Sequence, residues 1–184
     1  MPNYLRAKNP GGTFFLTFVS HDRRPFLTDD LAIDCIFNAY REIVRRRRFL
    51  LHAYCVLPDH IHVLVTLPRR DTDFPTRCRA FKSAFTRAYV RAGGKEGQRN
   101  VSRYRSGEAA VWQRRYWEHS IRNQHDFQRH FDYIHFNPVK HGLVREPEEW
   151  EWSTFRRYAL RGWYEANWGK AEPRNLSNLE SMGE

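Results

Sequence analysis

Two histidines, His60 and His62, stand one residue apart in a stretch from His60 to Leu67 that is typical of a β-strand. Side chains alternate across a strand, so both imidazoles point to one face while Ile61 points to the other. Neutral imidazole is a common metal ligand, and two of them on one face can share an ion. A His-x-His pair in a strand is also an ordinary half-exposed polar pair, so this spacing leaves both interpretations open.

Tyr133 and Asn137 are four residues apart in a segment, about 124–136, whose apolar residues recur at helical spacing. Positions i and i+4 lie on one face of a helix, and His130 shares that face from the preceding turn. An asparagine oxygen could complete a metal site begun by two histidines, and a nearby phenol could attack a phosphate held there. Alternatively, Tyr133 is a boundary aromatic side chain and Asn137 a polar residue that ends the helix before Pro138.

The elements that must position these residues alternate between strand and helix patterns. β-branched and aromatic runs indicate strands, and Thr28 could cap a helix that ends in the run Arg45–Arg48. We expect an α+β fold of the ferredoxin-like sandwich type, with a mainly antiparallel sheet and helices packed on one face. The other expected elements are strands at 13–20, 49–56, 60–67 and 116–121, helices at 75–91 and 124–136, a loop at 92–109 and a short helix after Ser153.

The chain has 184 residues, of which 41% are hydrophobic and 15% aromatic, so it can bury a sizeable core as one domain. No apolar run approaches the length of a membrane span. The three cysteines are widely spaced and odd in number, which argues against a disulfide framework and fits a reducing cytosol.

The net charge is +10, and nearly all of the surplus lies in residues 69–115, where 13 basic residues face 4 acidic ones. Neutralising phosphates releases counterions, so such clustering favours a nucleic-acid surface, although a solvated basic face is the simpler interpretation. We expect Arg99, Arg103 and Arg105 to contribute to such a surface, and aromatic side chains interleaved in this segment could stack on unpaired bases.

Three segments together resemble the REP-associated tyrosine transposases, a domesticated branch of the single-tyrosine HUH transposases. The resemblance runs from about residue 4 to residue 168, so we expect one catalytic domain over residues 1–168 and a polar C-terminal tail over 169–184. The segments are Pro58-Asp59-His60-Ile61-His62, Tyr116-Trp117-Glu118-His119-Ser120-Ile121-Arg122 and Asp132-Tyr133-Ile134-His135-Phe136-Asn137-Pro138-Val139-Lys140-His141-Gly142.

This resemblance implies roles for the residues singled out by spacing. His60 and His62 fall on the paired histidines of the HUH motif, and Asn137 falls where these enzymes place a third metal ligand. The implied cofactor is a divalent ion, and the ligand types leave Mg²⁺ and Mn²⁺ both open. Tyr133 falls on the nucleophilic tyrosine.

The resemblance also implies the substrate. The family acts on single-stranded DNA that carries repetitive extragenic palindromes (REP) folded as hairpins, so we expect a cytoplasmic, nucleoid-associated protein. Gly11, Gly12 and Thr13 fall on a motif implicated in reading the guide sequence beside the hairpin. One complete motif set slightly favours a monomer over a dimer.

The implied reaction is attack by Tyr133, which leaves a 5′-phosphotyrosine and a free 3′-hydroxyl. A phenol is mostly neutral at pH 7 and needs help to attack. His130 is a possible helper by helical spacing, and Lys140, His119 and metal-bound water compete for that role.

Two other interpretations remain. A catalytically silent domesticated transposase would bind hairpins in a regulatory or structural role. A two-histidine phosphoesterase would need a second His-x-Ser/Thr element, and His119-Ser120 does not have that spacing.

Overall fold

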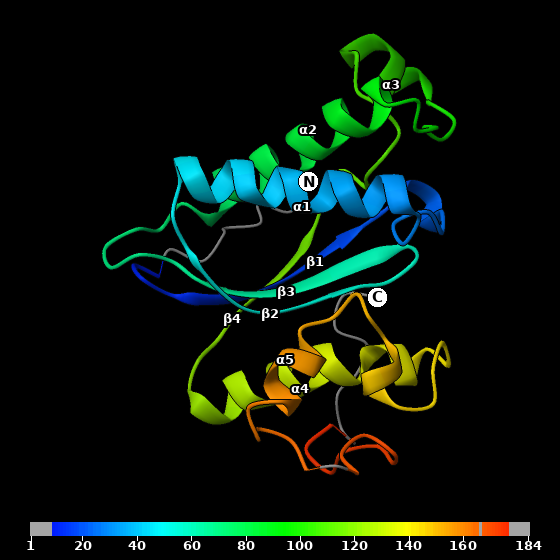
Figure 1. Ribbon diagram of the computed structural model, residues 1–184. Coiled ribbons are helices and arrows are strands. Elements are labelled where there is room, and N and C mark those ends of the chain that lie inside the picture. The colour runs from blue at the N-terminus through cyan, green and yellow to red at the C-terminus, as the bar shows by residue number, and fades with distance from the viewer. Residues whose placement is uncertain (1–8, 166, 177–184) are drawn as a thin grey trace.

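A four-stranded antiparallel sheet forms the centre of the computed structural model, which describes residues 9–165 and 167–176 (Figure 1). Neighbouring strands pair in the register Thr17 opposite His62 and Phe15 opposite His119. The expected α+β class with an antiparallel sheet is confirmed. The strand order is β2-β3-β1-β4, with bounds Leu50–Val56, His60–Thr66, Thr13–Val19 and Trp117–Ser120.

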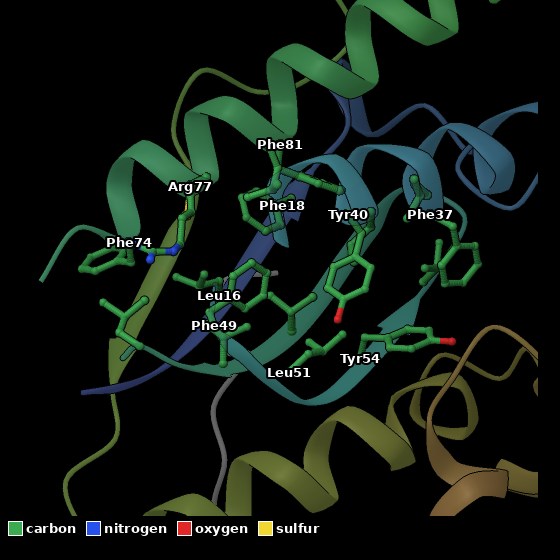
Figure 2. Close-up of a pocket in the computed structure, with 18 residues that line it drawn as sticks. Leu16, Phe18, Phe37, Tyr40, Phe49, Leu51, Tyr54, Phe74, Arg77 and Phe81 are labelled. Atoms are coloured by element: carbon green, nitrogen blue, oxygen red, sulfur yellow. The ribbon is translucent and has the colours of Figure 1, made fainter. Parts of the chain in front are cut away.

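Helices α1 (Asp30–Arg46) and α2 (Phe74–Arg91) cover one face of the sheet (Figure 1). An apolar cavity of about 110 Å³ lies between these helices and the strands (Figure 2). Arg77 borders it, but its guanidinium donates to Asp71 at 2.7 Å and to three main-chain carbonyls. The cavity therefore belongs to the hydrophobic core and offers no unpaired polar group from Arg77.

Helices α4 (Gln124–Lys140) and α5 (Phe155–Ala159) lie on the opposite face (Figure 1). We expected helices on one face of the sheet only, and the structure has helices on both faces. β1 explains the difference: Phe14 is buried against one helical layer and Phe15 against the other. A strand that is apolar on both faces needs cover on both.

Helix α4 continues past the proline that was expected to end it near Asn137. Pro138 lies inside the helix, which runs to Lys140. Proline removes one main-chain donor, but helical hydrogen bonding continues beyond it, because the N–H of His141 donates to the main-chain oxygen of Asn137 at 3.0 Å. The last turn therefore keeps Asn137 in helical register with the residues on either side.

A short helix, α3 (Val101–Ser106), stands where a basic loop was expected. The Asn100 side chain caps it by accepting from the N–H of Arg103 at 2.9 Å, and Gly107 ends it with φ +65°. Two 3₁₀ turns, η1 (His21–Arg23) and η2 (Pro147–Glu149), complete the elements of the described residues.

The chain after α4 covers the outer edge of β2. The N–H of Val56 donates to Trp152 at 2.8 Å, and the N–H of Thr154 donates to Tyr54 at 3.1 Å. The indole of Trp150 donates to the Val56 carbonyl at 2.9 Å. These bonds pair an edge that would otherwise be open to another strand.

Part of the expected polar tail packs against α4. The Asn175 amide donates to Asp132 at 2.7 Å, and Leu176 is buried. Residues 177–184 lie outside the described residues, and the expected domain boundary at 168 stays a prediction. Within the described part of the chain, no helix is long and apolar enough to cross a membrane.

Candidate active site between the sheet and helix α4

His60 and His62 point from β3 toward α4 and are almost completely buried, with exposed fractions of 1% and 0%. Their ring centroids are 4.7 Å apart and their planes meet at 78°. An imidazole binds a metal ion that lies in the plane of its ring. The planes of His60 and His62 cross at a steep angle, so one ion near their intersection can lie in both planes. The pair can therefore direct one nitrogen each toward a single ion.

A hydrogen bond at the Nδ1 atom holds each of these rings. Asp59 Oδ1 is 2.6 Å from Nδ1 of His60, and Thr17 Oγ1 is 2.9 Å from Nδ1 of His62. Each ring thus keeps Nε2 as its candidate ligand atom, and such outer partners commonly orient metal-binding histidines. Among the residues that the structure describes, the buried Nε2 of His60 has no hydrogen-bond partner. A buried polar atom of this kind is costly unless a ligand completes it.

Asp59 stays ionised beside His60. Burial alone would raise the pKa of its carboxyl, but hydrogen bonds from His60 and from Arg23, the latter at 2.8 Å, outweigh burial and lower this pKa to about 2. Residue spacing in the sequence did not assign Asp59 or Thr17 to the site. For Asp59, its position directly before His60 was an available signal, whereas Thr17 comes from a different strand.

Helix α4 presents Tyr133 and Asn137 to the histidine pair, and His141, which directly follows the helix, continues the spacing of four residues. The Tyr133 ring lies 5.4 Å from the His62 ring, and the His141 ring lies 5.3 Å from the His60 ring. Asn137 is one turn from each of them and is fully buried. The helix thus brings the predicted nucleophile and the predicted third ligand to the two histidines.

Lys140 contacts the phenol of Tyr133. Its Nζ donates to the phenol oxygen at 3.0 Å and lies 4.8 Å from the ring centroid. An ammonium group at this oxygen stabilises negative charge that develops there. Of the predicted helpers, Lys140 therefore has a direct contact with the predicted nucleophile.

His130 belongs to a second cluster with His119 and Asp126, in which the possible ligand atoms lie within 4.8 Å of one another. Asp126 Oδ2 is 2.8 Å from Nε2 of His119, and Nδ1 of His130 donates to the main-chain oxygen of Asp126 at 2.7 Å. The two imidazoles are stacked, with centroids 4.4 Å apart and planes at 14°. Nearly parallel planes do not converge on one ion, so the ring geometry favours His60 and His62 as the metal pair.

Charge in this cluster is set by burial and hydrogen bonding. Burial lowers the pKa of His130 to about 4, so its imidazole is neutral at pH 7. Burial would raise the pKa of Asp126, but hydrogen bonds from His119 and Arg122 outweigh it and lower this pKa to about 2. His130 packs against Phe15, with ring centroids 5.0 Å apart, and Phe15 also contacts Tyr133 at 6.0 Å.

The predicted guide-reading residues lie at the start of β1. The N–H of Gly11 donates to Asp71 at 2.9 Å, with φ +67° at Gly11, and Thr13 Oγ1 is 2.6 Å from Thr66 Oγ1. Thr13 lies four residues before Thr17, whose hydroxyl contacts His62. Four residues of strand span roughly 13 Å. The structure therefore separates Gly11, Gly12 and Thr13 from the histidine pair.

The three arginines predicted to contact DNA differ in their surroundings. Arg103 is only 4% exposed, and its guanidinium donates to Glu108 at 2.7 Å and to the main-chain oxygens of Ala109 and Trp112 at 2.9 Å. It holds α3 to the following segment and has little surface left for DNA. Arg99 pairs with Glu96 at 2.6 Å, and Arg105 is exposed. We therefore keep the DNA prediction for Arg99 and Arg105.

Known proteins resemble the chain over nearly its whole length. The family model for IS200-like transposases matches residues 12–137. A protein from Haemophilus influenzae is 39% identical over 170 residues, which cover 92% of this chain and 94% of the relative. A REP-associated tyrosine transposase from Escherichia coli K12 is 39% identical over 168 residues, or 91% of each chain.

A solved structure also matches. It is that of a REP-associated tyrosine transposase bound to a REP hairpin, and it shares 36% identity with this chain at a TM-score of 0.78. The match covers 100% of this chain and 98% of that one. Sequence and fold therefore agree, and this chain belongs to the REP-associated tyrosine transposases, within the IS200-like transposase family.

Proposed function

We propose that the chain is a metal-dependent single-stranded DNA endonuclease and strand transferase of the HUH class. Its substrate would be DNA with hairpin-forming REP sequences, by analogy with the relative bound to such a hairpin. The observation that carries the proposal is the buried, nearly perpendicular pair of His60 and His62 facing Tyr133 and Asn137 on α4. All four residues come from one chain, so we expect a monomer to act by itself, at the nucleoid in the cytoplasm.

The metal would be held by Nε2 of His60, Nε2 of His62 and the side-chain oxygen of Asn137. The anchored Nδ1 atoms and the buried Nε2 of His60 support this donor set. A divalent ion bound there would polarise a phosphodiester and help to orient it. Two imidazoles suit Mn²⁺ and the oxygen ligand suits Mg²⁺, so both ions are candidates.

Tyr133 would carry the covalent step. Its phenol oxygen forms a bond to phosphorus while the bond from phosphorus to the 3′ oxygen breaks, which gives a 5′-phosphotyrosine and a free 3′-hydroxyl. Lys140 donates to the phenol oxygen, so it stabilises charge on the nucleophile and on the leaving tyrosine in the reverse reaction. Since the phosphotyrosine retains the bond energy, the 3′-hydroxyl of another strand can displace the tyrosine without ATP.

The test uses Tyr133→Phe with an end-labelled hairpin that carries a single-stranded flank, in Mn²⁺ or Mg²⁺. We expect the unmodified chain to give a cleaved strand and a protein–DNA adduct on a denaturing gel, and the variant to give neither while it still binds the hairpin. Tyr104→Phe changes an exposed tyrosine on α3 and serves as the matched control. Cleavage by the Tyr133 variant would exclude this nucleophile, and hairpin binding with no adduct from the unmodified chain would favour a silent binding role.

A further inference from the structure

A second hollow lies on the sheet face opposite Tyr133. It runs between α2 and the segment from Gly107 to Tyr116, and its volume is about 460 Å³. We call it the α2 groove. Its basic and aromatic lining residues are Arg79, Lys82, Arg87, Arg114, Trp112 and Tyr116.

Positive charge exceeds negative charge along this groove. Glu108 is the acidic residue of its lining, and it is already shared by Arg103 and Arg114 at 2.7 and 2.8 Å. Lys82 donates to the main-chain carbonyls of Gln113 and Arg114 at 2.6 and 3.0 Å, which fixes its position beside the groove.

Two exposed arginines on α2 supply the wall of the groove. Arg79 and Arg87 are eight residues apart, with Ser83 between them, so all three share one face of the helix over about 12 Å. Among the described residues neither arginine has an ion pair or a hydrogen bond from its side chain. Guanidinium groups placed in this way match phosphate oxygens in charge and geometry.

We propose that the α2 groove binds the unpaired strand that flanks the hairpin, through its phosphates and at least one base. A concave site of this volume lies in the range of small-ligand pockets and is suited to a nucleotide, whereas a duplex has its phosphates on a wide convex surface. Tyr116, which is half-buried at the groove, offers a ring for base stacking. The proposal rests on the proposed function, because it concerns the same DNA.

The edge strand β4 connects the α2 groove with the active site. Tyr116 packs against Phe18 at 5.8 Å on the α2 side, and Trp117 packs against Phe15 at 5.6 Å on the α4 side. Two consecutive residues thus face the two sides of the sheet. In Figure 1 the chain passes from α3 along β4 to α4, on the outer edge of the sheet. A DNA strand held in the groove would reach Tyr133 by crossing this edge.

The experiment measures binding of two fluorescent hairpins, one with a single-stranded flank and one without. All proteins carry Tyr133→Phe so that cleavage does not interfere. We expect Arg79→Gln with Arg87→Gln to weaken binding of the flanked hairpin about tenfold and to reduce the salt slope by about 1.4, the value for two phosphates of a single strand. Binding of the hairpin without a flank should change less than about twofold.

The matched control is Arg157→Gln with Arg161→Gln, which removes two exposed charges at and after α5, on the other side of the sheet. An equal loss of affinity for both hairpins, an equal loss in the control, or no loss for the flanked hairpin would each overturn the groove proposal. If the protein that carries Tyr133→Phe alone binds neither hairpin, the result would instead contradict the proposed function. Thermal melts of each variant check that the fold is kept.

Discussion

At the scale of single residues, the candidate site depends on groups that do not themselves face the substrate. Asp59 and Thr17 each engage one nitrogen of a histidine and so fix which nitrogen faces α4. His60 and His62 would otherwise have two rotational states each, and only one presents Nε2 to the common point. We therefore expect metal binding to depend on Asp59 and Thr17 as well as on the proposed ligands.

We expect Asp59→Ala to weaken Mn²⁺ binding by about 10- to 100-fold, since the loss of a hydrogen-bond partner of a metal-binding histidine has effects of this size. Calorimetric titration of the protein with Mn²⁺ alone measures it. Arg23→Ala is the control: it removes the 2.8 Å ion pair to Asp59 but keeps the bond from Asp59 to His60, so its effect should be smaller. Equal affinity in the Asp59 variant and the unmodified protein would contradict this role.

We expect Lys140→Met to slow single-turnover cleavage by roughly 10- to 100-fold, a smaller effect than for a buried oxyanion donor because Lys140 is exposed. The reason is the loss of the ammonium group that donates to the Tyr133 oxygen. Lys140→Arg keeps the positive charge and should recover part of the rate. Hairpin affinity should remain within about twofold in both variants, and a rate unaffected by Lys140→Met would exclude the role.

At the scale of elements, α4 joins the site to the C-terminal part of the chain. One face carries Tyr133 and Asn137, while His135 is fully buried on another and bonds to the Tyr164 hydroxyl at 2.7 Å and to Thr154 at 2.8 Å. The segment that covers the edge of β2 thus also holds the helix that carries the predicted nucleophile. Substitutions in this segment would therefore shift the position of α4 and disturb the site, although the segment supplies none of the proposed site residues.

Two buried histidines of α4 make stability depend on pH. Burial lowers the pKa of His135 to about 3 and that of His130 to about 4, whereas an unfolded chain binds these protons near pH 6.5. Their contribution is fully present above pH 6.5 and is lost as the pH falls toward these folded values. We expect the free energy of unfolding to drop by up to about 4 kcal/mol between pH 7 and pH 5, measured by urea denaturation. Asp132, whose pKa burial raises, opposes this change.

The control for this pH dependence uses a third histidine of the same helix. His135→Gln should remove about half of the drop between pH 7 and pH 5, because one of the two buried imidazoles is gone. His125→Gln, at an exposed position near the start of α4, should leave the drop unchanged. Identical pH profiles for His135→Gln and the unmodified protein would refute the assignment.

Local patterns predicted most element types but not their limits. The strand at 60–67 and the helix at 75–91 were predicted to within one residue, because apolar periodicity is a local property of the sequence. The end of α4 was predicted wrongly, since the rule that proline ends a helix ignores packing that keeps the next turn helical. Helix α3 was missed because its six residues are too few for a periodic signal.

The candidate site was predictable where its residues stand at fixed intervals and hidden where they come from separate strands. His60 with His62 and Tyr133 with Asn137 follow from the periods of a strand and a helix. Thr17 reaches His62 only through strand pairing across 45 residues, which local spacing does not reveal. The stacking that argues against His119 and His130 as a metal pair likewise appears only in three dimensions.

At the scale of the whole molecule, the +10 charge serves more than one purpose. Arg77 and Arg103 are nearly buried and satisfy carbonyls and carboxylates inside the fold. Arg79, Arg87 and Arg105 are exposed. Counting charges in the sequence therefore overestimates the surface that is open to DNA.

We expect Arg103→Gln to lower the free energy of unfolding by about 2 to 4 kcal/mol, because a buried guanidinium with three hydrogen-bond partners is lost. Arg105→Gln, two residues away and exposed, should change stability by less than about 0.5 kcal/mol but weaken hairpin binding and its dependence on salt. Urea denaturation and binding titrations at two salt concentrations measure both effects. Equal stability of the two variants would contradict the structural role of Arg103.

The sheet with helices on both faces has a consequence for how this family can diversify. The residues proposed to hold the flanking strand lie on the α2 side, and the residues proposed to break it lie on the α4 side, with a layer of strands between them. A substitution at Arg79 or Arg87 leaves the surroundings of Tyr133 intact. On this proposal, the affinity for the flanking strand can change through the outer face of α2 while the chemistry around Tyr133 is kept.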